Sequence, residues 1–389
     1  MCRSAALFVA VVALFILSVC PHGVVRAATL TVGKNPAACP NAMYMTIQSA
    51  VNDAASGDTI HICAGTYPEQ VSIANKSLQV NGDNGAAIAP VDAAPNSNSL
   101  KSGQAIAAIV LVQSTTSVTI QNVIVDGSGN GCSPDPVGIF YQNASGTLNH
   151  VTVRNLELPP GLGGCQSGTG VFVQSGGGAS SVVTIENSSI HNYNKNGITA
   201  NELGTQVTIN GNVVTGLGTA AGAAQNGIQI GYGATGTIHA NIVVDHIYAP
   251  CTDPTTDCPA AADILVYDSE GVQVDHNEVG MSQIAIAIGA NNANVLDNTI
   301  FDSLFDGVLL DGNGNTATGN HITRSDQAAV LISGNANTVR KEVINDAAIG
   351  VLTTAGFAGN TVSGNTYRNT PVETQDPPAS AAKRASPYR

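Results

Sequence analysis

A Gly-Ile-like pair returns about every 22 residues through the second half of this 389-residue chain. The pairs begin, at steps of 22, 22, 22 and 21 residues, at Asp263, Ala285, Gly307, Ala329 and Gly350. A second marker keeps the same period some 14 residues later, at Asn277, Asn298, Asn320, Glu342 (in an Asn position) and Asn365. A period of 20–50 residues is typical of a repeat architecture in which similar units stack on one another.

Each repeat is predicted to form two or three short strands separated by polar turns. In residues 307–325, Val308 and Leu310 alternate with their neighbours, and Gly/Asn turns separate them from further short apolar segments. Such alternation predicts strands, and no stretch is long enough for the helices of a helical solenoid. The charged fraction of only 11% and the 42 Gly residues also favour strands and turns.

A strand-and-turn unit of this size cannot bury its apolar face alone, but it can when coiled onto its neighbours. Strands would then lie about 4.8 Å apart along the axis, with inward side chains stacked in columns. Asn suits the repeated turn position because it tolerates a left-handed backbone and because stacked amides hydrogen-bond from coil to coil.

Both markers continue towards the N-terminus with longer steps, which are 27–36 residues for the first marker. The first marker is carried by Gly138, Gly170, Gly197 and Gly227, and the second by Asn122, Asn149, Asn187, Asn212 and Asn241. The longer steps predict loops of roughly 5–14 residues, and solenoid insertions often gather on one face that is used for binding.

The two ends of the chain differ from the repeats. Residues 1–27 resemble a secretion signal, with Arg3, an apolar run over 5–19 and a small-residue cleavage site at Val25-Arg26-Ala27. The apolar run is too short for a membrane span, so we expect a secreted or periplasmic protein. Residues 370–389 are Pro-rich, locally basic and predicted to be a disordered tail.

An N-terminal cap is predicted over 28–65, before a solenoid over 66–369. An open solenoid end exposes apolar core and strand edges, which a cap must cover. Residues 46–57 are predicted to supply a short capping helix, because Thr46 is a suitable N-cap, Ile47 and Val51 belong to an apolar stripe, and Gly57 ends it.

Six Cys remain after the signal, and an even number in an exported chain favours disulfides. They are Cys39, Cys63, Cys132, Cys165, Cys251 and Cys258. Six Cys can pair in fifteen ways, and the expected stacking of the repeats favours three particular Cys pairs. Cys39 with Cys63 would pin the cap, Cys132 with Cys165 would join loops on either side of one coil, and Cys251 with Cys258 would close one insertion. No Cys or His spacing favours a structural zinc site.

The formal net charge is −13, and it becomes about −15 once Arg3 and Arg26 leave with the signal. Nucleic acid needs a basic face, so it is not an expected partner.

The run 46–73, followed by the coil repeats, resembles the right-handed parallel β-helix proteins of the pectin lyase-like superfamily. The piece Gly65-Thr66-Tyr67-Pro68-Glu69 is similar to the opening motif of pectinesterases and of many β-helix relatives. The resemblance covers nearly the whole mature chain. It implies an all-β, single-stranded right-handed parallel β-helix of about eleven coils, and a protein that binds or acts on a polysaccharide.

Pectinesterase motifs are not found, and the chain has no Trp. Polysaccharide lyases of this fold generally use acidic residues that hold Ca²⁺ and a Lys or Arg base on an external face. Polar residues in register near the second marker are therefore the candidate catalytic set: Lys195, Asp245, His246, Asp302 and Arg324. Asp302 and Asp306 are the candidate Ca²⁺ ligands. A solvated ridge of turns is the competing interpretation of the same residues.

A second hypothesis is a non-catalytic surface or assembly module. Positions predicted to face outward after the first marker become apolar in the later repeats, at Leu265, Ala287, Leu309, Leu331 and Leu352. An exposed apolar strip would mark an interface, and a homo-oligomer through these leucines is one expectation. The competing interpretation is that an insertion loop or the tail covers the strip.

Overall fold

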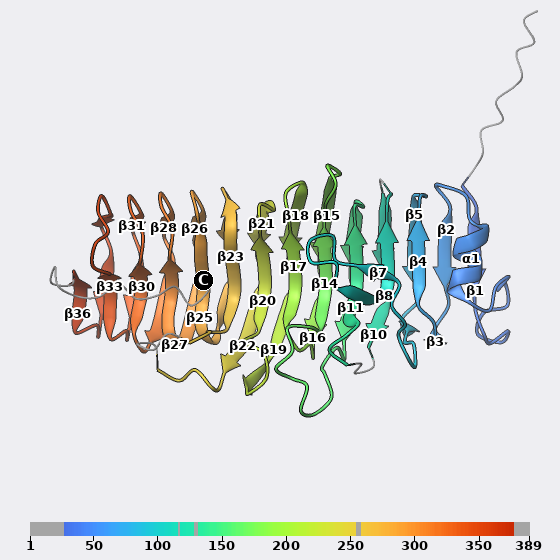
Figure 1. The fold of residues 1–389 in the computed structure, drawn as a ribbon, viewed down its shortest axis with the longest axis horizontal. Coiled ribbons are helices and arrows are strands. Elements are labelled where there is room, and N and C mark those ends of the chain that lie inside the picture. The colour runs from blue at the N-terminus through green and yellow to red at the C-terminus, as the bar shows by residue number, and fades with distance from the viewer. Residues whose placement is uncertain (1–26, 116, 128–130, 254–257, 377–389) are drawn as a thin grey trace, which may run out of the picture.

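The computed structural model describes residues 27–115, 117–127, 131–253 and 258–376. It is a right-handed parallel β-helix in which successive coils follow one another along the long axis (Figure 1). Each coil contributes strands to three ladders, which we call the first, second and third faces. Most of the predicted signal and tail lies outside the described residues.

The first face is a sheet of thirteen strands in which each strand pairs with the equivalent strand of the next coil. Its strands are β1 (Thr29–Val32), β2 (Thr59–Ile62), β5 (Leu78–Gly82), β9 (Val118–Gln121), β12 (Gly146–Asn149), β15 (Ser181–Glu186), β18 (Thr205–Asn210), β21 (Thr235–His239), β24 (Gln273–Asp275), β26 (Asn294–Leu296), β28 (Thr316–Thr318), β31 (Thr338–Arg340) and β34 (Thr361–Ser363).

The second face follows the first in each coil from β2 onwards. Its strands are β3 (Gly65–Tyr67), β6 (Ala86–Ile88), β10 (Ile124–Asp126), β13 (Thr152–Arg154), β16 (Ser189–His191), β19 (Val213–Ala220), β22 (Ile242–Tyr248), the first parts of β25 (Glu278–Asn291) and β27 (Thr299–Leu310), β29 (His321–Ser325), β32 (Val343–Asn345) and β35 (Thr366–Arg368).

The third face completes the coil. Its strands are β4 (Val71–Ala74), β8 (Ala105–Gln113), β11 (Asp135–Gln142), β14 (Thr169–Gln174), β17 (Asn196–Asn201), β20 (Asn226–Gly231), β23 (Ala262–Glu270), the later parts of β25 and β27, β30 (Ala328–Ile332), β33 (Ile349–Thr353) and β36 (Val372–Gln375). One short strand, β7 (Ser97–Asn98), pairs antiparallel with β8.

The predicted fold is confirmed, with more coils than the roughly eleven that the markers indicated. The additional coils lie at the N-terminus, where β1 and β2 pair in register although neither marker is present. Strands β1, β2 and β36 place coils outside the predicted solenoid limits of 66–369. None of the described residues belongs to a helix long and apolar enough to cross a bilayer.

The N-terminal end is covered as predicted by helix α1 (Ile47–Asp53). The side chain of Thr46 accepts a hydrogen bond from the backbone N–H of Ser49, which satisfies a free donor of the first turn. Ile47 and Val51 are buried against the first coils, so the helix closes the apolar interior at this end (Figure 1).

The first marker marks a close approach between coils. A Cβ on Gly227 would lie 2.3 Å from Cγ1 of Val243 and 2.6 Å from the backbone oxygen of Asp263. A Cβ on Gly307 would lie 2.7 Å from the backbone oxygen of Ala329. Small residues recur at this position because the chain there enters the third face directly against the next coil.

The second marker forms a ladder of buried amides. Oδ1 of Asn241 accepts from the backbone N–H of Asn212, and Asn277, Asn298 and Asn320 repeat the contact in later coils at 2.9 Å. The left-handed residue is usually the one before the ladder position, such as His276 and Asp297, and not the Asn itself. Asn122 and Asn187 are themselves left-handed, and Ser188 takes the ladder position in that coil.

The three favoured disulfides are present: Cys39–Cys63, Cys132–Cys165 and Cys251–Cys258. The loops that hold the second and third disulfides both lead into strands of the third face, so the insertions gather at one corner of the coil. Three disulfides are typical of a protein from an oxidising compartment, outside the cytosol.

Candidate functional site

A pocket of about 240 Å³ lies on the third face, over the middle coils. Strands β20 and β23 form its floor, and loops that enter the third face form its wall. It is lined by Gln166, Lys195, Ala224, Asn226, Gln229, Tyr232, Pro259, Ala260, Leu265 and Tyr267. We call this the third-face pocket.

Disulfide-held loops form the wall of the third-face pocket. The Cys132–Cys165 disulfide anchors the loop that carries Gln166, and Nδ2 of Asn194 donates to the backbone oxygen of Cys165 at 3.0 Å. On the other side, Nε2 of Gln283 donates to the backbone oxygen of Cys251. Oε1 of Gln283 accepts from the backbone N–H of Ala261 at 2.7 Å. The loops are therefore held to the coils beneath them at fixed points.

Hydrogen-bonded amides join neighbouring coils beside the pocket floor. Nδ2 of Asn196 donates to Oγ1 of Thr199 at 2.9 Å and to Oε1 of Gln229 at 3.2 Å. Nε2 of Gln229 donates to Oδ1 of Asn201 at 3.1 Å. This network fixes the orientation of Gln229, so its amide is preorganised for a polar ligand.

Two tyrosines form one end of the pocket. The rings of Tyr232 and Tyr267 meet edge to face with centroids 5.5 Å apart. Tyr232 is 43% exposed and therefore presents ring surface to solvent. Burial of its hydroxyl, together with the nearby Tyr267, raises the pKa of Tyr232, so the hydroxyl stays neutral in ordinary buffers.

Lys195 supplies the charge of the pocket. Its Nζ donates to the backbone oxygen of Ala224 at 2.5 Å. Burial lowers the pKa of Lys195 to about 8. The ammonium is thus the main form at neutral pH, and a substantial neutral fraction forms near pH 8. Among the residues described, the lining holds no carboxylate.

Three of the predicted catalytic residues lie in one row of turns, but this row does not converge on the third-face pocket. Asp245, Asp302 and Arg324 occupy equivalent left-handed turn positions, as do Met281 and Asp346 in other coils. Arg324 makes a bidentate ion pair with Asp302 of the preceding coil, with both side chains largely exposed. Of the five predicted catalytic residues, the structure places only Lys195 at this pocket.

His246 lies inside the coil and not on the outer ridge. It is fully buried, with Nε2 2.5 Å from the hydroxyl of Tyr193 and Nδ1 2.6 Å from Oδ1 of Asp263. Burial lowers the pKa of His246 to about 3, so the ring is neutral. Strand β22 has to turn from the second to the third face, and the left-handed Asp245 directs the next residue inward.

The predicted Ca²⁺ pair does not fit a cation site. Asp302 is exposed and bound by Arg324, whereas Asp306 is fully buried. Asp306 lies in register with Ile284 and Ala328, both within an apolar cluster. Since Ca²⁺ needs several oxygen ligands around one accessible point, these two carboxylates cannot share it.

The apolar strip is buried, which corrects the hypothesis of an exposed interface. Leu265, Leu309 and Leu331 are only 5%, 3% and 1% exposed. They belong to a second apolar cluster, outside the coil interior, which also contains Ala287 and Phe305. Cys251 and Ala260 of the insertion belong to the same cluster, and Leu352 packs against it. The sequence identified these positions as outward-facing but could not show that they are covered.

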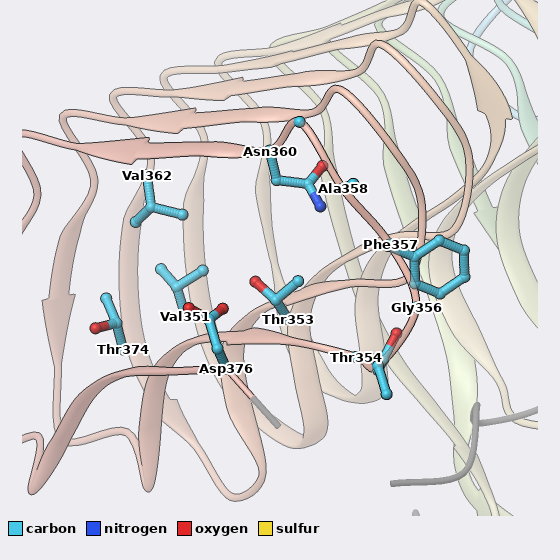
Figure 2. Close-up of a pocket in the computed structure, with 12 residues that line it drawn as sticks. Val351, Thr353, Thr354, Gly356, Phe357, Ala358, Asn360, Val362, Thr374 and Asp376 are labelled. Carbon is cyan, nitrogen blue, oxygen red and sulfur yellow. The ribbon is translucent and has the colours of Figure 1, made fainter. Parts of the chain in front are cut away.

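A larger hollow of about 510 Å³ lies at the last coil (Figure 2). Val351 and Val362, which belong to or pack against the main core, lie at its floor, and the turn of Phe357 and Ala358 lies beside it. No further coil of the described chain stacks on β34 and β36. The hollow is therefore the open end of the stack and not a built site.

Sequence reasoning missed most of the third-face pocket. Gln229 and Tyr267 are in register with residues of other types in neighbouring coils, so no column of like residues marked them. Tyr232 directly follows β20 and lies outside the register. A signal was available in the long steps between Gly197, Gly227 and Asp263, which place the insertions beside these coils.

The family model "Right handed beta helix region" matches residues 257–374. By sequence, no curated protein matches the chain. Among solved structures, the A-module of the mannuronan C-5 epimerase AlgE6 from Azotobacter vinelandii is similar, with a TM-score of 0.55 and 16% identity over 85% of this chain and 94% of that one.

Two other solved structures are similar to the chain. A GH136 lacto-N-biosidase from Eubacterium ramulus has a TM-score of 0.54 and 11% identity, over 88% of this chain and 68% of that one. PfbA, a surface adhesin of Streptococcus pneumoniae, has a TM-score of 0.55 and 14% identity, over 82% and 85%. At these identities the likeness is one of fold. The chain is therefore a right-handed parallel β-helix protein by its fold.

Proposed function

We propose that this protein binds an extracellular polysaccharide in the third-face pocket. The observation that carries the proposal is Lys195, a single half-buried cation in a pocket lined with tyrosines and amides and walled by disulfide-held loops. Concave sites with aromatic surface and a few fixed polar groups are typical of small-ligand recognition. Sugar rings offer C–H faces for Tyr232 and Tyr267 and hydroxyls for Gln229.

An acidic polysaccharide suits the charge of the pocket. The chain as a whole carries a net charge of −13, which repels polyanions at long range. Within the described lining of the pocket, however, Lys195 meets no carboxylate. A uronate carboxylate that accepts from Nζ would replace or share the bond to Ala224, and its partial exclusion from water would strengthen the pair.

Lys195 also supports a finer proposal, lyase-type elimination. In its neutral form Nζ would take the proton from the ring carbon beside the uronate carboxylate. The electron pair would form a carbon–carbon double bond, the glycosidic carbon–oxygen bond would break, and water would protonate the leaving oxygen. A lysine pKa lowered to about 8 provides the neutral base at mildly alkaline pH.

Binding is tested with the purified full chain on a panel of soluble polysaccharides: polygalacturonate, alginate and neutral dextran. We expect binding to a uronan and not to dextran. Lys195→Gln and Tyr267→Ala should each weaken that binding at least about tenfold. Lys341→Gln, which removes an exposed lysine in a turn away from the pocket, is the matched control and should not change the binding. Equal binding by all three variants would refute the pocket.

Elimination is tested by ultraviolet absorbance of the unsaturated product, with and without a chelator. Product formation that rises towards pH 8 and is lost in Lys195→Gln would support Lys195 as the base that removes the proton. Uronan binding without product leaves the polysaccharide-binding proposal standing and refutes the lyase chemistry.

A further inference from the structure

A second cluster of chemistry-bearing side chains lies on the first face, away from the third-face pocket. His239 ends β21, Asp275 ends β24, and the two are register partners in adjacent coils. His276 follows Asp275 in the left-handed turn position. Nδ1 of His239 lies 2.6 Å from Oδ2 of Asp275, and Nδ1 of His276 lies 2.8 Å from the same oxygen.

From this geometry we propose that His239, Asp275 and His276 bind a divalent transition-metal ion, with Zn²⁺ the best match. One ligand atom from each residue lies within 4.8 Å of the other two. Two imidazole nitrogens and one carboxylate oxygen form a common zinc ligand set that leaves a coordination position for water. Imidazole favours Zn²⁺ and its neighbours over Ca²⁺ or Mg²⁺.

The scaffold beneath the cluster is rigid. Nδ2 of Asn241 donates to the backbone oxygen of His239 at 2.9 Å, and Nδ2 of Asn277 donates to the backbone oxygen of Asp275 at 3.0 Å. Both amides belong to the buried ladder, so the two strand ends are held by the most regular element of the fold. This fixes the spacing of the ligands before any ion binds.

The side chains are arranged for entry of an ion from solvent. Asp275 is 8% exposed and is oriented by Nε2 of Gln273, which donates to its Oδ1 at 3.0 Å. His239 and His276 are 45% and 57% exposed. Their rings can therefore rotate by the small amount that brings nitrogens to zinc distance, while an outer hydrogen bond keeps the carboxylate in place.

The other cluster of potential ligands among the described residues offers a control. His61, Cys63 and Asp83 also lie together, but Cys63 is joined to Cys39 in a disulfide and cannot ligate. What remains is a single His–Asp pair, with Nε2 of His61 2.9 Å from Oδ1 of Asp83. This pair lacks the second imidazole that the proposal requires.

The test is a titration of the chelator-treated full chain with ZnCl₂ by calorimetry, and with Co²⁺ by visible spectroscopy. We expect one Zn²⁺ per chain at this site and an intense visible Co²⁺ band of low coordination number. His239→Ala and Asp275→Asn should each weaken Zn²⁺ binding at least about tenfold, and the double variant H239A/H276A should abolish it. His61→Ala should leave it unchanged.

Thermal unfolding keeps the result interpretable if a variant is less stable. Zn²⁺ should raise the Tm of the parent chain and of Lys195→Gln, but not that of H239A/H276A. Absence of Zn²⁺ binding by the parent chain, or binding that survives in the folded double variant, would overturn the proposal.

Discussion

Nδ1 of His246 and Oδ1 of Asp263 lie 2.6 Å apart inside the coil, with neither side chain exposed. The hydroxyl of Tyr193 completes the group on the other side of the imidazole. Burial lowers the pKa of His246 and raises that of Asp263, so both groups tend towards their neutral forms. His246 thus forms a hydrogen bond on each side of its ring to another buried polar side chain.

Replacing His246 with Ala should therefore destabilise the fold. The change leaves a cavity and removes the partner of both Tyr193 and Asp263, so we expect a loss of roughly 3 kcal/mol or more in the free energy of unfolding. Chemical denaturation measures this loss. His321→Ala, at an exposed position of β29, is the matched control and should change stability little. A fully stable His246→Ala variant would contradict the buried network.

Glu342 gives the fold a specific pH dependence. Burial raises its pKa from 4.5 to about 8, although hydrogen bonds from Asn320 lower it in part. The folded state therefore retains a proton that the unfolded state releases above pH 4.5. The stability that this group contributes is full below pH 4.5 and is lost as the pH rises towards 8.

Glu342→Gln should remove that dependence. Each unit of pKa difference corresponds to about 1.4 kcal/mol, so we expect the variant to be more stable than the parent by a few kcal/mol near pH 8. The difference should vanish well below pH 4.5, where both states of the parent hold the proton. Paired melting curves across this range check the prediction, and a gap that is constant with pH would disprove it.

The amide ladder should be sensitive to single truncations. Oδ1 of Asn277 accepts from the backbone N–H and Nδ2 of Asn241, and its own Nδ2 donates to the backbone oxygens of Ile238 and Asp275. Asn277→Ala removes these hydrogen bonds, and the buried backbone N–H of Asn241 loses its acceptor, so we expect a loss of roughly 3 kcal/mol. Asn294→Ala, outside the ladder, is the control. Comparable losses in the free energy of unfolding of the two variants would show that the ladder contributes no more stability than an ordinary surface Asn.

The Cys251–Cys258 disulfide should keep the insertion closed over the apolar strip. Cys251 packs in the same cluster as Leu265 and Leu309. The double change to Ser should loosen this cover and increase binding of a hydrophobic dye, with a modest loss of stability because the disulfide closes only a short loop. Opening Cys39–Cys63 instead should not expose the strip. Unchanged dye binding would mean that the insertion is held without the disulfide.

The fold could be predicted because most coils, from Asn122 onwards, repeat the same requirements. A small residue is needed where a Cβ on Gly227 would strike Val243, and an amide is needed where Asn241 and Asn277 stack. Because these positions recur at a regular spacing along the chain, the residues that fill them form a periodic sequence pattern. The Cys132–Cys165 pair could be predicted for the same reason, because stacked coils bring loops at equivalent positions together.

The third-face pocket could not be predicted in the same way, because it depends on a single region. Tyr232, Tyr267 and Gln229 line one pocket in a single region of the chain, where the insertions lie beside β20 and β23. Their arrangement is not repeated from coil to coil. The periodic polar residues instead identified the turn ridge of Asp302 and Arg324. Inward and outward orientation was also ambiguous near bends, which is why His246 was expected on the surface.

Hydrogen–deuterium exchange with a bound uronan oligosaccharide tests the central claim most directly, because it reports where the ligand lies without relying on any variant. We predict that the ligand slows exchange in residues 194–201, 224–232 and 258–267, which form the third-face pocket and its wall. Slowed exchange only around the open end at 351–376, only along the first face, or nowhere at all would contradict the assignment of this pocket as the binding site.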